Sequence, residues 1–151
     1  MKPGSRNSDI VSNLDFAQTF LDIAGVKSPA DMQGTSLVPL FKGHTPKDWR
    51  THFYYHYYEF PGAHSVARHY GVTNGRHKLI HFYQNNEWEL FDLKKDPNEL
   101  QSVYGNSDYK TIQSDLLAEL KRLRVHYKVP EEDPVPPKRK RPNQPNRPKK
   151  K

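Results

Sequence analysis

The dipeptide Asn74-Gly75 is the feature that constrains the fold most. It lies between two short runs, 66–73 and 77–83, that are rich in β-branched and aromatic residues. Asn-Gly tolerates a positive φ at both central positions of a type I′ turn, which suits the twist of two antiparallel strands. We therefore predict a β-hairpin whose turn is centred on these two residues.

Two further runs extend the hairpin into a sheet. The aromatic run 52–59 favours a strand, because aromatic side chains suit a pleated, half-buried surface. Residues 87–93 predict another strand after the polar turn Gln84-Asn-Asn86. Since short connections join antiparallel neighbours, we expect a four-stranded meander.

A long helix is predicted over residues 108–127. Its apolar residues recur at three- and four-residue spacings, and its charged residues occupy the opposite side. This helix should cover one face of the sheet. A small antiparallel sheet with a helix on one side is an α+β arrangement.

The N-terminal third predicts two helices. Ser12 and Asp15 resemble a capping box, and Gly25 suits a left-handed C-terminal cap, so a helix is expected between them. That helix is apolar over much of its circumference, which favours a position between other elements. Residues 36–41 predict a short second helix ended by Gly43.

The charge is concentrated at the C-terminus. The chain of 151 residues has a net charge of +7, but residues 138–151 contain 8 Lys or Arg and no acid. This leaves 16 bases against 17 acids in the rest of the chain. The tail 129–151 is also rich in proline, so we expect it to be disordered and to act either as a binder of polyanions or as a solvated tail without a specific partner.

Several kinds of chemistry have no residues to support them. The sequence contains 0 cysteines, so disulfides and thiolate nucleophiles are excluded. The N-terminus carries no signal peptide, and no apolar run reaches the length of a membrane span. None of the eight histidines has metal-ligand spacing, and His77 and His81 share a strand face without an evident carboxylate.

A binding role is predicted for His64, Arg68 and His69, where a loop enters the second strand. A guanidinium beside imidazoles suits a sulfate or carboxylate, because arginine offers paired donors and histidine a tunable proton. The alternative is a polar strand edge with a satisfied arginine. Both interpretations remain open at this stage.

Blocks of the sequence resemble type I, formylglycine-dependent sulfatases of the alkaline-phosphatase-like superfamily. Residues 12–25, 32–43 and 89–100 match the late part of those enzymes in order and spacing. The resemblance covers residues 1–128. It implies that residues 1–43 are the C-terminal remnant of the large α/β sulfatase domain, that residues 44–128 form the C-terminal subdomain, and that residues 129–151 are a tail outside the family.

The resemblance implies hydrolysis of sulfate esters, often on sugars, by a formylglycine nucleophile with calcium. The sequence contains no Cys/Ser-x-Pro-x-Arg motif, so we expect neither cofactor in this chain and no activity of the chain alone. Family members are often exported to the periplasm, the lysosome or the medium. The subdomain walls one side of the substrate pocket in the family, which would place His64, Arg68 and His69 near a sulfated sugar, with His64 first.

Two other functions compete with this one. The chain could be a non-catalytic module that holds a sulfated or other anionic polymer through its sheet or its tail. Nucleic-acid binding is the weakest alternative, because the aromatic residues lie in the near-neutral body while the basic residues lie in the tail.

Overall fold

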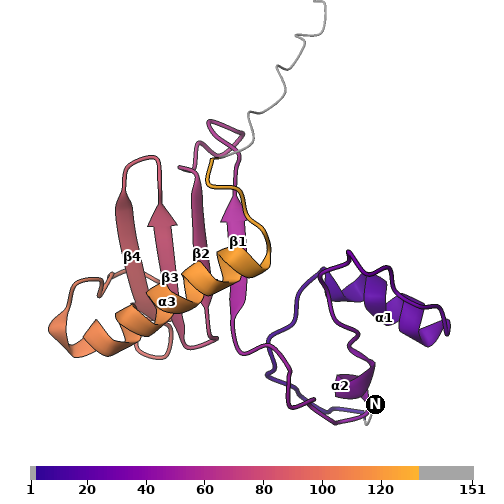
Figure 1. Ribbon diagram of the computed structural model, residues 1–151. Helices are drawn as coiled ribbons and strands as arrows, with labels where there is room; N and C mark the ends of the chain where they lie inside the picture. Colours follow the sequence, from indigo (N-terminus) through magenta and orange to yellow (C-terminus); the bar gives the residue numbers. More distant parts are fainter. Residues whose placement is uncertain (1–2, 133–151) are drawn as a thin grey trace, which may run out of the picture.

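The computed structural model describes residues 3–132, so most of the predicted tail, including its basic residues, lies outside the described part. Figure 1 shows a twisted sheet crossed by one long helix, with a separate group of short helices beside it. The elements are α1 (Asp15–Ile23), α2 (Val38–Phe41), β1 (Phe53–Tyr57), β2 (His69–Thr73), β3 (His77–Phe82), β4 (Glu87–Asp92), a 3₁₀ turn (Ser107–Tyr109) and α3 (Lys110–His126). The predicted α+β class is confirmed.

The sheet is the predicted antiparallel meander, in the order β1-β2-β3-β4. Its strands are shorter than predicted at several ends. The clearest case is β2, which begins at His69 and not at Val66, because Tyr57 opposite His69 is the last residue of β1 that pairs. Residues 58–68 therefore form a long loop at one end of the sheet.

The β2–β3 turn is displaced by one residue from its prediction. Thr73 pairs with Lys78, so the two central residues are Gly75 and Arg76. Gly75 has the positive φ, +84°, whereas Asn74 does not. The side chain of Asn74 accepts the N–H groups of Arg76 and His77, at 3.0 and 2.7 Å, in place of a backbone carbonyl. The hairpin was correct, and the type I′ turn at Asn74-Gly75 was wrong.

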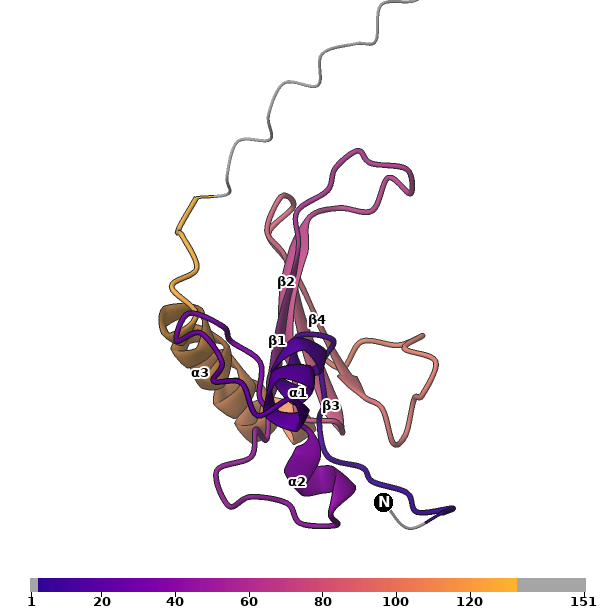
Figure 2. The ribbon, with the colours of Figure 1, turned by 90° about the vertical axis from the view of Figure 1, so that its right-hand side faces the viewer.

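One face of the sheet is covered by α3, as predicted. Leucines at four- and three-residue spacing on the helix meet the sheet residues that alternate toward it. The buried cluster consists of Val72, Leu79, Leu90, Tyr109, Leu116, Leu120 and Leu123. Figure 2 shows α3 on one side of the sheet and the segment after β4 on the other. That segment is tied there by Lys78, whose Nζ lies 2.6 Å from Glu99 Oε2.

The carboxylate of Asp15 holds the N-terminal third together. It is fully buried and accepts hydrogen bonds from both Nη atoms of Arg50, each at 2.6 Å. It also accepts hydrogen bonds from the backbone N–H groups of Ser12 and Thr35, at 2.7 and 2.9 Å. Burial by itself would raise the pKa of Asp15, but the hydrogen bonds from Arg50 and the two backbone groups outweigh it and lower this pKa. One half of the predicted capping box forms, the bond from Ser12 N–H to Asp15, but the residue that caps α1 is Leu14 and not Ser12.

Helix α1 ends as predicted but packs by its polar side. Gly25 has φ +67°, and the Val26 N–H bonds to the Leu21 carbonyl at 2.8 Å, as in a Schellman motif. The buried residues of the helix are Asp15, Gln18 and Thr19. Phe16 and Phe20 are 55% and 69% exposed, so nothing in residues 3–132 covers the apolar side of α1.

We predict that Leu79→Ala lowers the free energy of unfolding by about 2–5 kcal/mol, because Leu79 is fully buried between α3 and the sheet. Urea unfolding followed by circular dichroism measures the change. Leu100→Ala is the matched control, since Leu100 is 82% exposed and its truncation leaves no cavity. Equal losses for the two variants would contradict this account of the core.

We also expect the chain to self-associate through the uncovered side of α1, because an exposed apolar patch favours association. Phe16→Ser together with Phe20→Ser should bring the mass measured by sedimentation equilibrium down to the monomer value of 17.7 kDa. Leu100→Ser removes an exposed leucine elsewhere and should leave the mass distribution as in the wild type. A monomeric wild-type chain would refute the expectation.

Candidate functional site

The loop 58–68 holds His64 and Arg68, two of the three residues predicted to bind a ligand, and the third, His69, is the first residue of β2. Figure 2 shows it standing above the ends of the strands, beside the β3–β4 turn. The two connections touch, since the Arg68 N–H donates to Gln84 Oε1 at 2.7 Å. The last pair between β1 and β2 joins Tyr57 and His69, so the residues between them leave the sheet and form the loop at this end.

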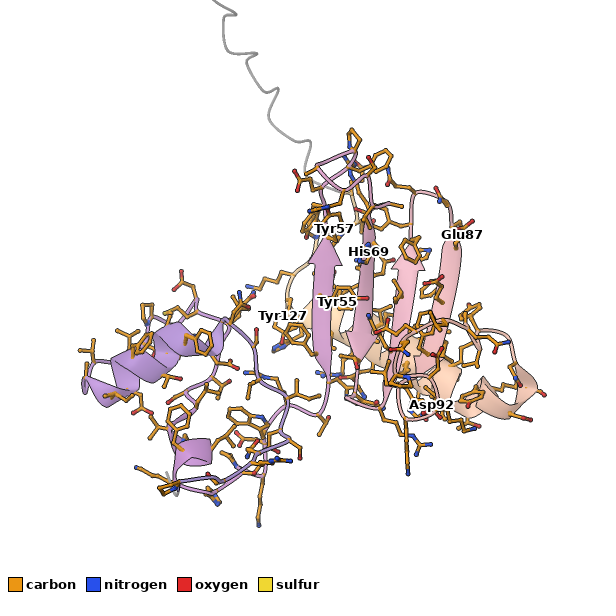
Figure 3. All side chains as sticks on the ribbon, turned by 180° about the vertical axis from the view of Figure 1, so that it is seen from behind. Tyr55, Tyr57, His69, Glu87, Asp92 and Tyr127 are labelled. Atoms are coloured by element: carbon orange, nitrogen blue, oxygen red, sulfur yellow. The ribbon has the colours of Figure 1, made fainter. Side chains whose placement is uncertain are left out.

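His69 lies on the sheet face opposite α3. Figure 3 shows it between Tyr55 and Tyr57 on this face. Its ring is 5.3 Å from the Tyr57 ring, 5.8 Å from the Tyr55 ring and 5.1 Å from the Phe82 ring, measured between centroids. His69 Nδ1 lies 2.9 Å from the carbonyl of Ala67. Because a carbonyl can only accept, this bond requires the proton on Nδ1 and leaves the lone pair on Nε2.

His64 and Arg68 are loop residues. His64 is exposed in the turn that follows Pro61, and Arg68 is half-buried just before β2. Arg68 lies outside β2, whose first residue is His69. The structure therefore brings the three residues to one end of the sheet, with His69 as the member held by the ring cluster.

A row of rings on the α3 face escaped the sequence analysis. His56, Tyr70, His81 and Trp88 occupy directly paired positions on four successive strands. Their centroids are separated by 5.4 Å, 5.2 Å and 3.9 Å along the row. Neighbouring strands lie about 4.8 Å apart, so the row extends about 14 Å across the sheet. Only the register reveals it, because the four residues lie far apart in sequence.

A groove of about 380 Å³ runs between this row and the C-terminal turns of α3. Tyr70 and Trp88 form its floor, and Leu117, Lys121, Arg124 and Val129 are among its walls. Arg124 stacks over the ring of Tyr70, with 4.1 Å from Cζ to the ring centroid. Burial raises the pKa of the neighbouring Tyr54 to about 12, although the charge of Arg124 opposes the shift.

The other end of the sheet holds a buried ionic cluster. His77 Nε2 lies 3.7 Å from Asp92 Oδ2, which corrects the expectation that His77 has no carboxylate nearby. The same oxygen lies 3.4 Å from Arg76 Nη2 and 3.4 Å from the hydroxyl of Tyr109. Burial lowers the pKa of His77, with the charges of Arg76 and Lys95 adding to the shift and Asp92 opposing it. The carboxylate comes from β4, so only the strand pairing brings it to His77.

Two findings concern metals and membranes. Within residues 3–132, no group of three His, Cys, Asp or Glu side chains could hold a metal ion. None of the described helices is both long and apolar enough to cross a bilayer.

Sulfatases are among the known proteins similar to this chain. N-acetylglucosamine-6-O-sulfatase of Bacteroides thetaiotaomicron is 49% identical over 131 residues, which are 85% of this chain and 24% of that protein. Delta 4,5-hexuronate-2-O-sulfatase of the same organism is 33% identical and matches over 76% of this chain and 23% of its own length. The chain thus spans about a quarter of the length of these relatives.

A solved structure gives the same result for the fold. It is described as a complex with its substrate D-glucosamine-2-N,6-O-disulfate, and it aligns with a TM-score of 0.74 and 48% identity over 78% of this chain and 24% of its own. The sheet with its terminal helix is therefore the C-terminal region of a sulfatase of the alkaline-phosphatase-like superfamily. Residues 1–126 match the family described as N-sulphoglucosamine sulphohydrolase, C-terminal, and the chain belongs to that family.

We predict that the chain loses stability as the pH falls below the ordinary His pKa of 6.5, because the folded state lowers the pKa of His77 and protonation favours unfolding. The loss should continue until the pH reaches the folded-state pKa. His77→Gln removes this contribution and should reduce the slope of the unfolding free energy between about pH 7 and pH 5, while His81, whose pKa burial also lowers, keeps part of the slope. The control is His44→Gln at an exposed position. A slope unchanged by His77→Gln would contradict the prediction.

Proposed function

We propose that this chain is the part of a glycan sulfatase that walls one side of the substrate pocket, and that it supplies no catalytic group itself. Its ligand in the complete enzyme is a sulfated sugar, which the loop 58–68 contacts through His64 and Arg68. His69 supports the loop from its ring cluster on the face opposite α3. The formylglycine and the calcium ion come from sequence outside this chain.

The placement of loop 58–68 carries the proposal. The Arg68 guanidinium and the His64 imidazole lie at one end of a rigid sheet, on a connection that the strand pairing leaves long, and the His69 imidazole begins the next strand. Binding residues are commonly carried by loops that a rigid scaffold positions. Arginine suits a sulfate because its fork of N–H donors matches two oxygens at once. The relative with a D-glucosamine-2-N,6-O-disulfate substrate supports a sugar of that class.

The uncovered side of α1 supports the assignment of residues 1–43 to a larger domain. A helix that buries its polar side within the chain and exposes phenylalanines presents an interface. In the complete enzyme, the large sulfatase domain would pack against this side of α1. In that arrangement, Asp15 and Arg50 fix the segment that joins the two domains.

A chimera tests the function. The matching C-terminal quarter of the Bacteroides thetaiotaomicron N-acetylglucosamine-6-O-sulfatase is replaced by this chain, and hydrolysis of N-acetylglucosamine 6-sulfate is followed. We expect turnover by the chimera and a loss of kcat/KM of about tenfold or more in its Arg68→Ala and His64→Ala variants, since a charged hydrogen bond contributes about 1.5–3 kcal/mol.

Two controls accompany the chimera. Arg122→Ala removes an exposed cation from α3 and should leave kcat/KM unchanged. The isolated chain should release no nitrophenol from 4-nitrophenyl sulfate with calcium, and turnover above the blank would overturn its non-catalytic role. An active chimera whose Arg68→Ala and His64→Ala variants keep full activity would overturn the pocket wall while leaving the family assignment intact.

A further inference from the structure

Arg124 is a half-buried cation near the C-terminal end of α3. Its guanidinium lies on the ring of Tyr70, and its hydrogen bonds to Tyr54 Oη and the Pro130 carbonyl are both long, at 3.4 Å. Among residues 3–132, no carboxylate lies within ion-pair distance of it. A guanidinium has five N–H donors, so the two long bonds leave most of its capacity for an external acceptor.

Lys121 adds a second cation to the same side of α3. It precedes Arg124 by three residues, and such pairs are neighbours on a helix surface. Both residues line the groove above Tyr70 and Trp88. The adjacent Arg122 differs, because its Nε and Nη2 atoms both donate hydrogen bonds to the Glu119 carboxylate at 2.7 Å, so that the two charges of this pair cancel. The free positive charge of this part of α3 is therefore directed at the groove.

The floor and the walls of the groove are largely apolar. Tyr70 and Trp88 of the ring row form the floor, with Leu117 beside them. The C-terminal turn of α3 closes one side, because Lys128 has φ +52° and the Val129 N–H returns to the Arg124 carbonyl at 2.9 Å. Glu131, at the rim, is the acidic residue among those that line it. Two cations against one acid give the groove a positive balance.

We propose that this groove binds a sulfated saccharide, with the sulfate at Lys121 and Arg124 and a sugar ring beside Trp88. The occupant is argued from charge complementarity and from the amphipathic lining. Sulfate offers several acceptor oxygens to the donors of Arg124, and the C–H groups of a sugar suit an aromatic surface. The groove lies on the α3 face, whereas the His69 ring lies on the opposite face, so this site is independent of the proposed pocket wall.

Indole resonances report occupancy of the groove directly. The chain contains two tryptophans. Trp88 lines the groove, and Trp49 is buried with its Nε1 donating to the Ile10 carbonyl at 3.0 Å. Addition of a heparin hexasaccharide should shift the Trp88 Nε1–H signal and leave that of Trp49 in place. Binding by the tail alone would leave both signals unmoved and would overturn the proposal.

Paired substitutions on α3 test the cations. Lys121→Glu and Arg122→Glu make the same change in net charge in adjacent exposed residues of the full chain. We expect Lys121→Glu to weaken heparin-hexasaccharide binding by about fivefold or more, and Arg122→Glu to change it by less than about twofold. Equal effects of the two would show attraction by overall charge and would overturn the site.

Two further ligands distinguish the contribution of the sulfate groups from that of the sugar backbone. An unsulfated N-acetylheparosan hexasaccharide has a similar sugar backbone and should not shift Trp88 at the same concentration. Inorganic sulfate should shift it only at concentrations far above those needed for the hexasaccharide. If the unsulfated sugar binds as tightly as the sulfated one, the assigned role of Lys121 and Arg124 is wrong.

Discussion

The packing of α3 on one face of the meander is the interaction on which the rest of the structure depends. Leu116, Leu120 and Leu123 bury Val72, Leu79 and Leu90, and the two-residue alternation of the strands then assigns every other side chain to a face. A slip of one residue would exchange the faces and expose the core. The same burial therefore places His69 among the tyrosines of the face opposite α3. It places Tyr70, the next residue, on the α3 face under Arg124.

The N-terminal third is held together by a different kind of interaction. Asp15 is buried with Arg50 and two backbone N–H groups, so its charge is compensated at every oxygen. That polar centre uses the side of α1 which a free-standing protein would normally expose. The phenylalanines on the other side fit a chain that spans about a quarter of its sulfatase relatives.

Two surfaces follow from one small sheet. The loop 58–68 carries His64 and Arg68 at the end of the strands, and the groove beside α3 carries two cations above a row of rings. Both suit sulfated sugars by the same chemistry, in which planar or clustered donors meet sulfate oxygens. A sulfatase that acts on a polymer would gain from a second contact, because linked sites raise the effective concentration of the substrate.

The sequence by itself determined the elements and the family. Period-two and period-three-to-four patterns are local, so they identified the meander, the long helix and the Gly25 cap, and the sulfatase blocks identified the C-terminal region. The turn at Gly75 and Arg76 needed the structure, because the Asn74 side chain replaced a backbone acceptor. So did the ring row, the Asp92 partner of His77, and the polar packing of α1. The last three arise from contacts between residues distant in sequence, and only the tertiary structure decides such contacts.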